Sequence, residues 1–181
     1  MQPGAWLPPT TMCKRLFVGI EARQQALFES AMALGEQLPG RYHPLANYHV
    51  TLAFIGAYAQ GPVQQALERL PCRGPLWLET LPVPGFFKEG KKAVLYAPVK
   101  PSDPLGLLAY GVGKCLKEAK IPFDDRETYT PHVTLARGVD SAAYGGQILC
   151  QVQWEAADFC LYESVSGETG LTYQVLKRFK I

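Results

Sequence analysis

Apolar and polar residues along this chain alternate in short runs that predict many strands and few helices. Lys14–Ile20 is dense in strand-forming residues. The stretch 22–38 repeats Leu27, Ala31 and Leu34 at helical spacing. The remaining predicted elements are strands at 48–56, 76–81, 93–99, 131–137, 152–162 and 172–179, and helices at 62–70 and 104–120. This order favours an α+β fold in which largely antiparallel sheets pack against helices.

The size of the chain fits one domain. Its 181 residues are 48% hydrophobic and 19% charged, as in an ordinary globular domain. Pro3, Pro8 and Pro9 interrupt the start of the chain, so we expect residues 1–13 to be a loose arm and 14–181 a single domain. No apolar run approaches the roughly 20 residues of a membrane-spanning helix. We therefore expect a protein that does not enter a membrane. We also expect a monomer.

Charge and cysteine content narrow the classes of function. The 18 Lys and Arg residues nearly balance the 16 Asp and Glu residues, which excludes a protein that coats nucleic acid through a large positive field. A phosphate-bearing partner must then bind at a local site. The five cysteines are an odd number and contain no Cys-x-x-Cys pair, so we expect reduced thiols, a cytoplasmic location, and neither a metal nor a cofactor.

A tetrapeptide repeat is the most informative feature. The sequence His-Val-Thr-Leu begins at His49 and again at His132, and the chain has only 3 histidines. Side chains alternate between the two faces of a strand, so each histidine shares a face with the threonine two residues later, Thr51 or Thr134. Two such strands around an approximate two-fold axis would present two imidazoles and two hydroxyls to one cleft.

These side chains suit acid–base chemistry on a phosphodiester. One imidazole can act as a base and the other as an acid, because the usual pKa of histidine is close to neutrality. The threonine hydroxyls can donate to a bound anion, and Arg137 offers a planar fork for phosphate oxygens. In an unbroken strand Arg137 would face away from His132, and we expect a bulge at Gly138 to bring it round.

The chain resembles the two-histidine phosphoesterases, specifically the LigT-like RNA 2',3'-cyclic phosphodiesterases that are also called 2'-5' RNA ligases. The resemblance covers nearly the whole chain after the arm. The matching segments are the opening strand 15–20, the signatures Tyr48–Gly56 and Tyr129–Arg137, and the closing strands 159–164 and 173–179. Asn47-Tyr48 departs from the family's usual Asn-Leu, and we expect Tyr48 to point away from the cleft.

The resemblance implies a bilobed fold with pseudo-two-fold symmetry, in which two mainly antiparallel sheets flank a central cleft and helices pack outside. It implies metal-independent hydrolysis of RNA terminal 2',3'-cyclic phosphate to 2'-phosphate, and reverse 2'-5' joining of RNA ends. By the same resemblance, His49 is the acid and His132 the base, although a symmetric pair can exchange roles. Thr51, Thr134 and Arg137 would hold the phosphate of an RNA end, such as a tRNA-like fragment, or of a small cyclic nucleotide.

Some assignments stay open at this point. Phe54, Phe86 and Phe87 are either stacking partners of bases or core residues. His43 is interpreted as a loop residue, with a zinc site shared with the other two histidines as the alternative. The function has two alternatives as well: a phosphodiesterase for another cyclic or 2'-5'-linked nucleotide, or a noncatalytic protein that binds RNA ends.

Overall fold

The computed structural model describes residues 12–181. The predicted arm therefore lies outside the described residues up to residue 11, and Cys13, its last residue, is already the first residue of a strand. The helices are α1 (Gln25–Gly35), α2 (Gln60–Leu67) and α3 (Asp103–Glu118). The strands are β1 (Cys13–Glu21), β2 (Arg41–Tyr42), β3 (His49–Ala59), β4 (Leu76–Glu79), β5 (Gly85–Glu89), β6 (Lys92–Pro98), β7 (His132–Val139), β8 (Gln153–Ala156), β9 (Asp158–Gly167) and β10 (Gly170–Lys180).

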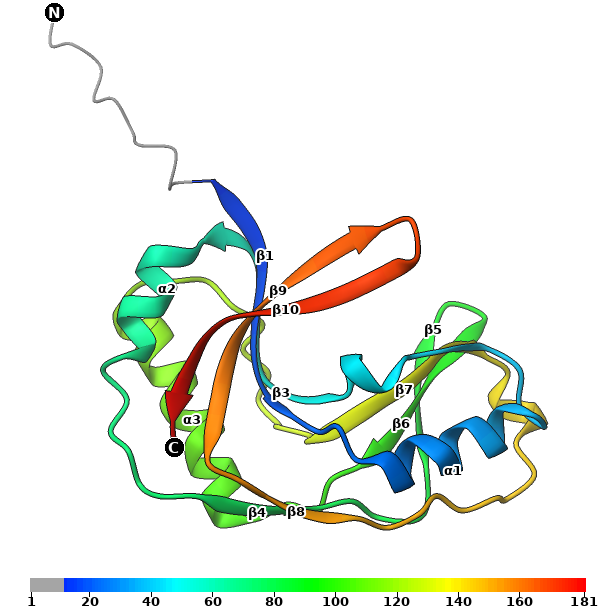
Figure 1. Ribbon diagram of the computed structural model, residues 1–181. Coiled ribbons are helices and arrows are strands. Elements are labelled where there is room, and N and C mark those ends of the chain that lie inside the picture. The colour runs from blue at the N-terminus through cyan, green and yellow to red at the C-terminus, as the bar shows by residue number, and fades with distance from the viewer. Residues whose placement is uncertain (1–11) are drawn as a thin grey trace, which may run out of the picture.

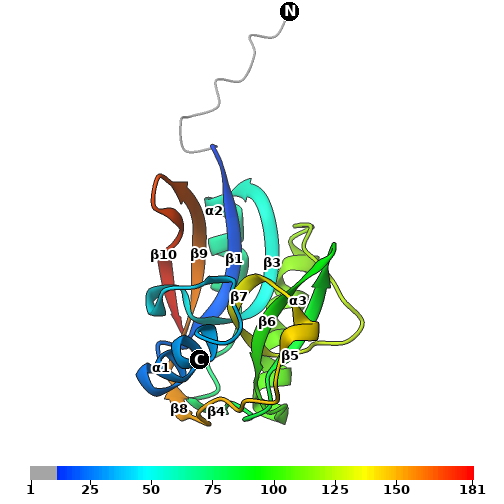
Figure 2. The ribbon, with the colours of Figure 1, turned by 90° about the vertical axis from the view of Figure 1, so that its right-hand side faces the viewer.

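Most of the strands form one 8-stranded antiparallel sheet. Its order is β10-β9-β1-β3-β7-β6-β5, with β2 paired to β7, and β4 and β8 form a separate 2-stranded sheet (Figure 1). The hairpins β9–β10 and β5–β6 lie at opposite ends of the large sheet, as the side view shows (Figure 2). The predicted α+β class is confirmed.

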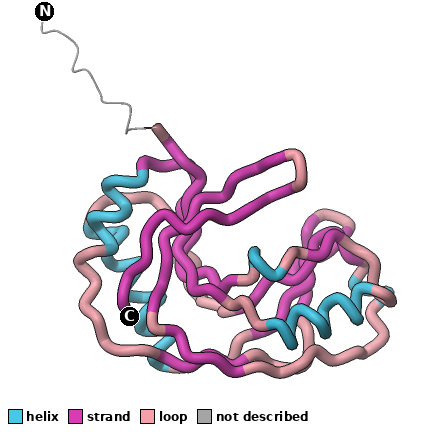
Figure 3. The backbone as a smooth tube through the Cα atoms, in the orientation of Figure 1, coloured by secondary structure: helices cyan, strands magenta, loops and turns pink. Residues whose placement is uncertain are grey.

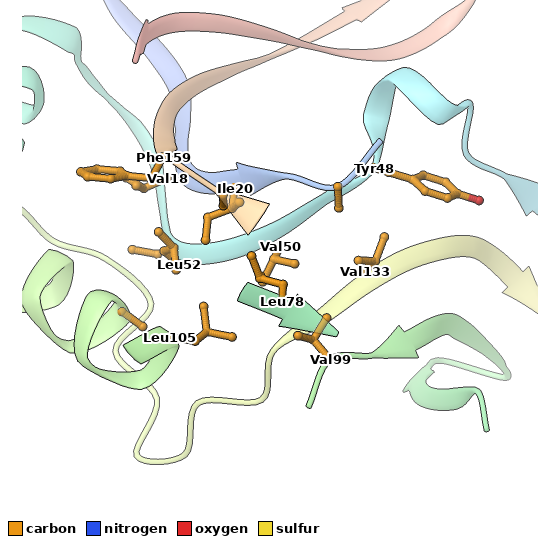
Figure 4. Close-up of a cluster of buried hydrophobic side chains, with 14 of the residues drawn as sticks. Val18, Ile20, Tyr48, Val50, Leu52, Leu78, Val99, Leu105, Val133 and Phe159 are labelled. Carbon is orange, nitrogen blue, oxygen red and sulfur yellow. The ribbon is translucent and has the colours of Figure 1, made fainter. Parts of the chain in front are cut away.

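The two halves of the large sheet meet at one residue pair. β3 and β7 are antiparallel and share only the register pair Val50 and Val133. Both valines are fully buried and belong to the main hydrophobic cluster, where Figure 4 shows them close together. The two sheets expected from the sequence are therefore two halves of one sheet, which are joined only through this residue pair, called the hinge pair below.

The two signature strands also carry the same irregularities. In β3, Leu52 is an extra residue relative to β1, because Thr51 pairs with Gly19 while Ala53 pairs with Val18. In β7, Leu135 is extra relative to β6 in the same position of its motif. Each strand has a second bulge a few residues later, before Gly56 in one case and before Val139 in the other. The repeat in sequence is thus a repeat in backbone shape.

Helices cover the outside of both halves, and the tube view shows α1 apart from α2 and α3 (Figure 3). α1 contacts β2, while α2 contacts β1 and α3 contacts β3. Ser102 caps α3 by accepting a hydrogen bond from the Leu105 backbone N–H at 3.3 Å, and Pro104 fits the first turn because it needs no donor there. No helix within residues 12–181 is both long and apolar enough to span a membrane.

Two details differ from the expected elements. The predicted strand 152–162 is interrupted at Ala157, whose carbonyl accepts a hydrogen bond from the Ile181 N–H at 3.0 Å. Its first part, β8, pairs with β4, and its second part, β9, pairs with β1. β2 and β5 were not predicted as strands, because the first is 2 residues long and the second combines two phenylalanines with charged residues.

Shortening the hinge pair should destabilise the fold. We expect Val50→Ala and Val133→Ala each to lower the free energy of unfolding by about 2 kcal/mol, because two buried methyl groups are replaced by a cavity. Urea unfolding measures this. Val83→Ala is the matched control, since Val83 is 60% exposed and should change by less than about 0.5 kcal/mol. Equal small losses in all three variants would contradict the role of the pair.

Candidate active site

The repeated motifs line one cleft of about 1000 Å³. Val50 pairs with Val133, so the histidine and threonine that flank each valine lie at the point where the two strands meet. The valines point into the core, so alternation directs the histidines and threonines to the other face. The structure thus brings together in this cleft all four polar side chains that the repeat singles out.

Backbone carbonyls orient both imidazoles in the same way. His49 Nδ1 lies 2.8 Å from the carbonyl of Asn47, and His132 Nδ1 lies 2.7 Å from the carbonyl of Thr130. A carbonyl only accepts hydrogen bonds, so each Nδ1 must carry the proton. Nε2 is therefore the unprotonated nitrogen of each neutral ring, and in His49 it accepts a hydrogen bond from the Thr51 hydroxyl at 3.1 Å.

Aromatic rings hold each imidazole in place. His49 packs against one ring from β1 and one from β10, and His132 packs against one ring from β5 and one from β6. The ring-centroid distances are 4.7 Å to Phe17 and 5.0 Å to Tyr173 for His49, and 5.0 Å to Phe87 and 5.2 Å to Tyr96 for His132. This packing restricts ring rotation and removes water from the imidazoles.

Burial makes both histidines weak bases in the free protein. It lowers the pKa of His49 to about 4, against the opposing effect of the Asn47 carbonyl and with smaller contributions from His43 and His132. Burial also lowers the pKa of His132, to which the charges of Arg126 and Arg137 contribute. Both rings are therefore neutral at pH 7, and an anion bound beside them would raise both pKa values by favouring the charged form.

Arg137 reaches the cleft because of a bulge. It lies five residues after His132, so unbroken alternation would point it to the opposite face. The extra residue Leu135 shifts the alternation by one, and Arg137 lines the cleft. The responsible bulge precedes Arg137, which corrects the expectation that Gly138 turns it, although Gly138 has a φ of 68° in the second bulge. Arg137 Nη1 forms an ion pair with Glu89 Oε2 at 2.5 Å.

Phe54 occupies the corresponding place in β3, five residues after His49. It lines the cleft, is 39% exposed, and lies beneath the Arg15 guanidinium, whose carbon is 5.5 Å from the ring centroid. Phe86 does not face the cleft: its ring packs against Tyr144 at 5.3 Å. Since neighbouring strand residues point to opposite faces, Phe87 lines the cleft instead.

Tyr48 points away from the cleft, as expected. It is almost fully buried, packs edge-on against Phe28 at 6.0 Å, and is drawn among the core side chains in Figure 4. The aromatic substitution before His49 therefore does not alter the cleft.

Two cleft residues were missed in the sequence. His43 lies in the loop after β2, as expected, and from there it lines the cleft beside Arg137, which the sequence did not indicate. Tyr129 donates a hydrogen bond from its hydroxyl to the Thr51 carbonyl at 2.8 Å and fixes the segment before β7 against β3. The one signal in the sequence was that each of these residues lies shortly before one of the two His-Val-Thr-Leu motifs. Residues 12–181 contain no group of three or more His, Cys, Asp or Glu side chains placed to hold a metal, so the three histidines do not form the zinc site considered above.

The fold is similar to that of solved phosphoesterases. E. coli LigT in its apo form superposes with a TM-score of 0.72 at 22% identity, covering 94% of this chain and 98% of that one. TT0787 of Thermus thermophilus gives 0.69 at 22% identity, covering 92% and 97%. The MHV ns2 PDE domain gives 0.54 at 14% identity, covering 93% and 99%.

Sequence comparison gives the family. A search of curated proteins finds no match to this chain. The family model described as the 2'-5' RNA ligase superfamily matches residues 20–165. This span contains both signatures and the pair Val50 and Val133 that joins the two halves of the sheet. The chain therefore belongs to the 2'-5' RNA ligase superfamily.

Proposed function

We propose that this protein hydrolyses RNA terminal 2',3'-cyclic phosphates to 2'-phosphates through acid–base catalysis by His49 and His132. The observation that carries the proposal is the pair of imidazoles that line one cleft, each with Nδ1 bound to a backbone carbonyl and Nε2 unprotonated. Such a pair can remove a proton on one side of a phosphate and deliver a proton on the other. The chemistry requires no metal.

The reaction needs two proton transfers. A water molecule attacks phosphorus while one histidine Nε2 takes its proton, and the bond from phosphorus to the 3'-oxygen breaks while the other histidine protonates that oxygen. The product is a 2'-phosphate with a free 3'-hydroxyl. By the family resemblance, His49 is the acid and His132 the base. The same two proton transfers with a 5'-hydroxyl in place of water would form a bond from phosphorus to the 5'-oxygen, release the 3'-oxygen and keep the 2'-oxygen on phosphorus, which joins RNA ends through a 2'-5' linkage.

The phosphate would be held by uncharged and charged donors together. The Thr51 and Thr134 hydroxyls lie on the same strand face as the histidines. Thr134 can donate to a nonbridging oxygen directly, and Thr51, whose hydroxyl donates to Nε2 of neutral His49, can do so once that nitrogen is protonated. Arg137 supplies a guanidinium once it leaves Glu89. Developing negative charge on the phosphate in the transition state strengthens these contacts, which is how they would accelerate the reaction.

The substrate we propose is an RNA end or a small cyclic nucleotide. Structures of E. coli LigT include complexes with 3'-AMP, ATP, NADP+ and phosphate. In this chain the exposed ring of Phe54 offers a stacking surface for a base at the edge of the cleft. The cysteines are all free, which supports a reducing, cytoplasmic setting.

Removing either imidazole should abolish most of the activity. We expect His49→Ala and His132→Ala each to lower kcat/KM for adenosine 2',3'-cyclic phosphate by at least about 100-fold, the usual contribution of a general acid or base. The assay follows formation of the 2'-phosphate with excess chelator present, and thermal unfolding checks the fold of each variant. Full activity in both variants would refute the mechanism. Tight binding of RNA ends without turnover by the wild type would favour an RNA-end-binding protein instead.

The pH profile should reflect the lowered pKa values. Above its pKa a histidine loses its proton, and the acid needs that proton, so activity is lost as pH rises. Because the pKa of His49 is about 4 and that of His132 lies below 6.5, kcat/KM should peak on the acid side of neutrality and fall between pH 7 and 8. The kcat profile should lie at higher pH, because bound phosphate raises both pKa values. A kcat/KM that increases from pH 7 to 8 would contradict this assignment.

Glu89 should weaken anion binding because it competes for Arg137. We expect Glu89→Gln to tighten inorganic phosphate binding about tenfold and to lower the KM for the cyclic substrate about threefold, since inorganic phosphate carries more negative charge than a cyclic diester. Calorimetry and steady-state kinetics measure the two effects. Glu155→Gln, an equal charge change in β8 and outside the cleft lining, is the control. Identical phosphate affinity in the wild type and Glu89→Gln would show that the ion pair does not oppose binding.

A further inference from the structure

His43 is placed beside the phosphate-binding groups by backbone pairing. His43 follows β2 directly, and its backbone N–H donates a hydrogen bond to the Leu135 carbonyl at 2.8 Å. Arg41 pairs directly with Arg137 in the β2–β7 ladder. Since side chains two residues apart share a face, His43 lies on the same face as Arg137, and both line the cleft.

One nitrogen of His43 has no partner. Nδ1 is buried and makes no hydrogen bond within residues 12–181. An unsatisfied buried polar atom costs folding stability, and a leucine at this position would avoid that cost. With Nδ1 buried, Nε2 is the ring nitrogen with which a ligand in the cleft could form a hydrogen bond. The proton is best placed there, because a buried acceptor without a partner is tolerated more readily than a buried donor.

The surroundings keep this imidazole uncharged. Burial, and then the nearby charge of Arg137, lower the pKa of His43 to about 4. A neutral ring with a proton on Nε2 can donate to an anion without repelling the Arg137 guanidinium, whereas a second cation there would repel it. The position thus combines an uncharged ring with a place in the lining of the cleft.

We propose that His43 is a third phosphate-binding residue, whose neutral imidazole donates from Nε2 to a nonbridging oxygen of the bound phosphate next to Arg137. The inference rests on the proposed function for the identity of the anion. It adds a contact on the β7 side of the cleft only, because the three histidines leave no counterpart in the other half. The symmetric pair of motifs would therefore hold the phosphate asymmetrically, with His43 and Arg137 acting on the same side.

Three variants test the proposal. His43→Leu removes the donor and keeps an apolar side chain of similar size, and His43→Gln keeps an N–H donor. Tyr48→Phe is the matched control, because the Tyr48 hydroxyl is also buried and unpartnered within the described chain but lies outside the cleft lining. The measurements are inorganic phosphate binding by calorimetry, KM and kcat with adenosine 2',3'-cyclic phosphate, and thermal unfolding.

For His43→Leu we expect the phosphate Kd and the KM to increase about tenfold, the loss typical of a hydrogen bond to a charged group. Its kcat should fall by about threefold at most, since a neutral donor gains less from the charge that develops in the transition state than the Arg137 cation does. Its Tm should be equal to or above that of the wild type. His43→Gln should retain most of the binding, and Tyr48→Phe should bind phosphate as the wild type does.

The outcomes separate this inference from the proposed function. Unchanged phosphate Kd in His43→Leu would overturn the inference. Equal weakening in His43→Leu and His43→Gln together with a lowered Tm would also overturn it, because it would show a packing role. A wild type that binds phosphate but does not hydrolyse the cyclic substrate would refute the proposed function, while the binding measurements would still decide the role of His43.

Discussion

The cleft depends on a single antiparallel register pair. Val50 and Val133 are the only residues through which β3 and β7 pair, and both side chains are fully buried. Their burial decides that the residues on either side, His49 and His132 among them, face the cleft. A slip of one residue would turn the histidines into the core and the valines into water. Hydrophobic burial on one face thus positions the polar groups on the other.

The duplicated bulges extend this control further along each strand. An extra leucine after each threonine, Leu52 or Leu135, returns the fifth residue after each histidine to the cleft. That residue is Phe54 in one half and Arg137 in the other. One repeated backbone therefore carries an aromatic side chain on one side of the cleft and a cation on the other. The two halves share the imidazoles and differ in what they offer the rest of a ligand.

The sequence predicted those features that depend on neighbours in the chain, and it did not predict those that depend on contacts between distant segments. Alternation along a strand sufficed to place His49 and Thr51 together, because it involves neighbours in the chain. The direction of Arg137 depended on a bulge at Leu135, and the choice of Phe87 over Phe86 depended on the face that β5 turns to the cleft. His43 reaches the cleft only because β2 pairs with β7. The interruption at Ala157 follows from contacts with the distant C-terminus.

Burial of the imidazoles gives the cleft its chemical character. A backbone carbonyl holds Nδ1 of each ring, so proton exchange is confined to Nε2. The aromatic neighbours exclude water and lower the pKa of both histidines, so neither holds a second proton at pH 7 in the free protein. A bound phosphate supplies the negative charge that lets one ring become protonated while the other stays neutral. The anion then helps to create the protonation state that its own hydrolysis requires, which couples recognition of a phosphate to catalysis.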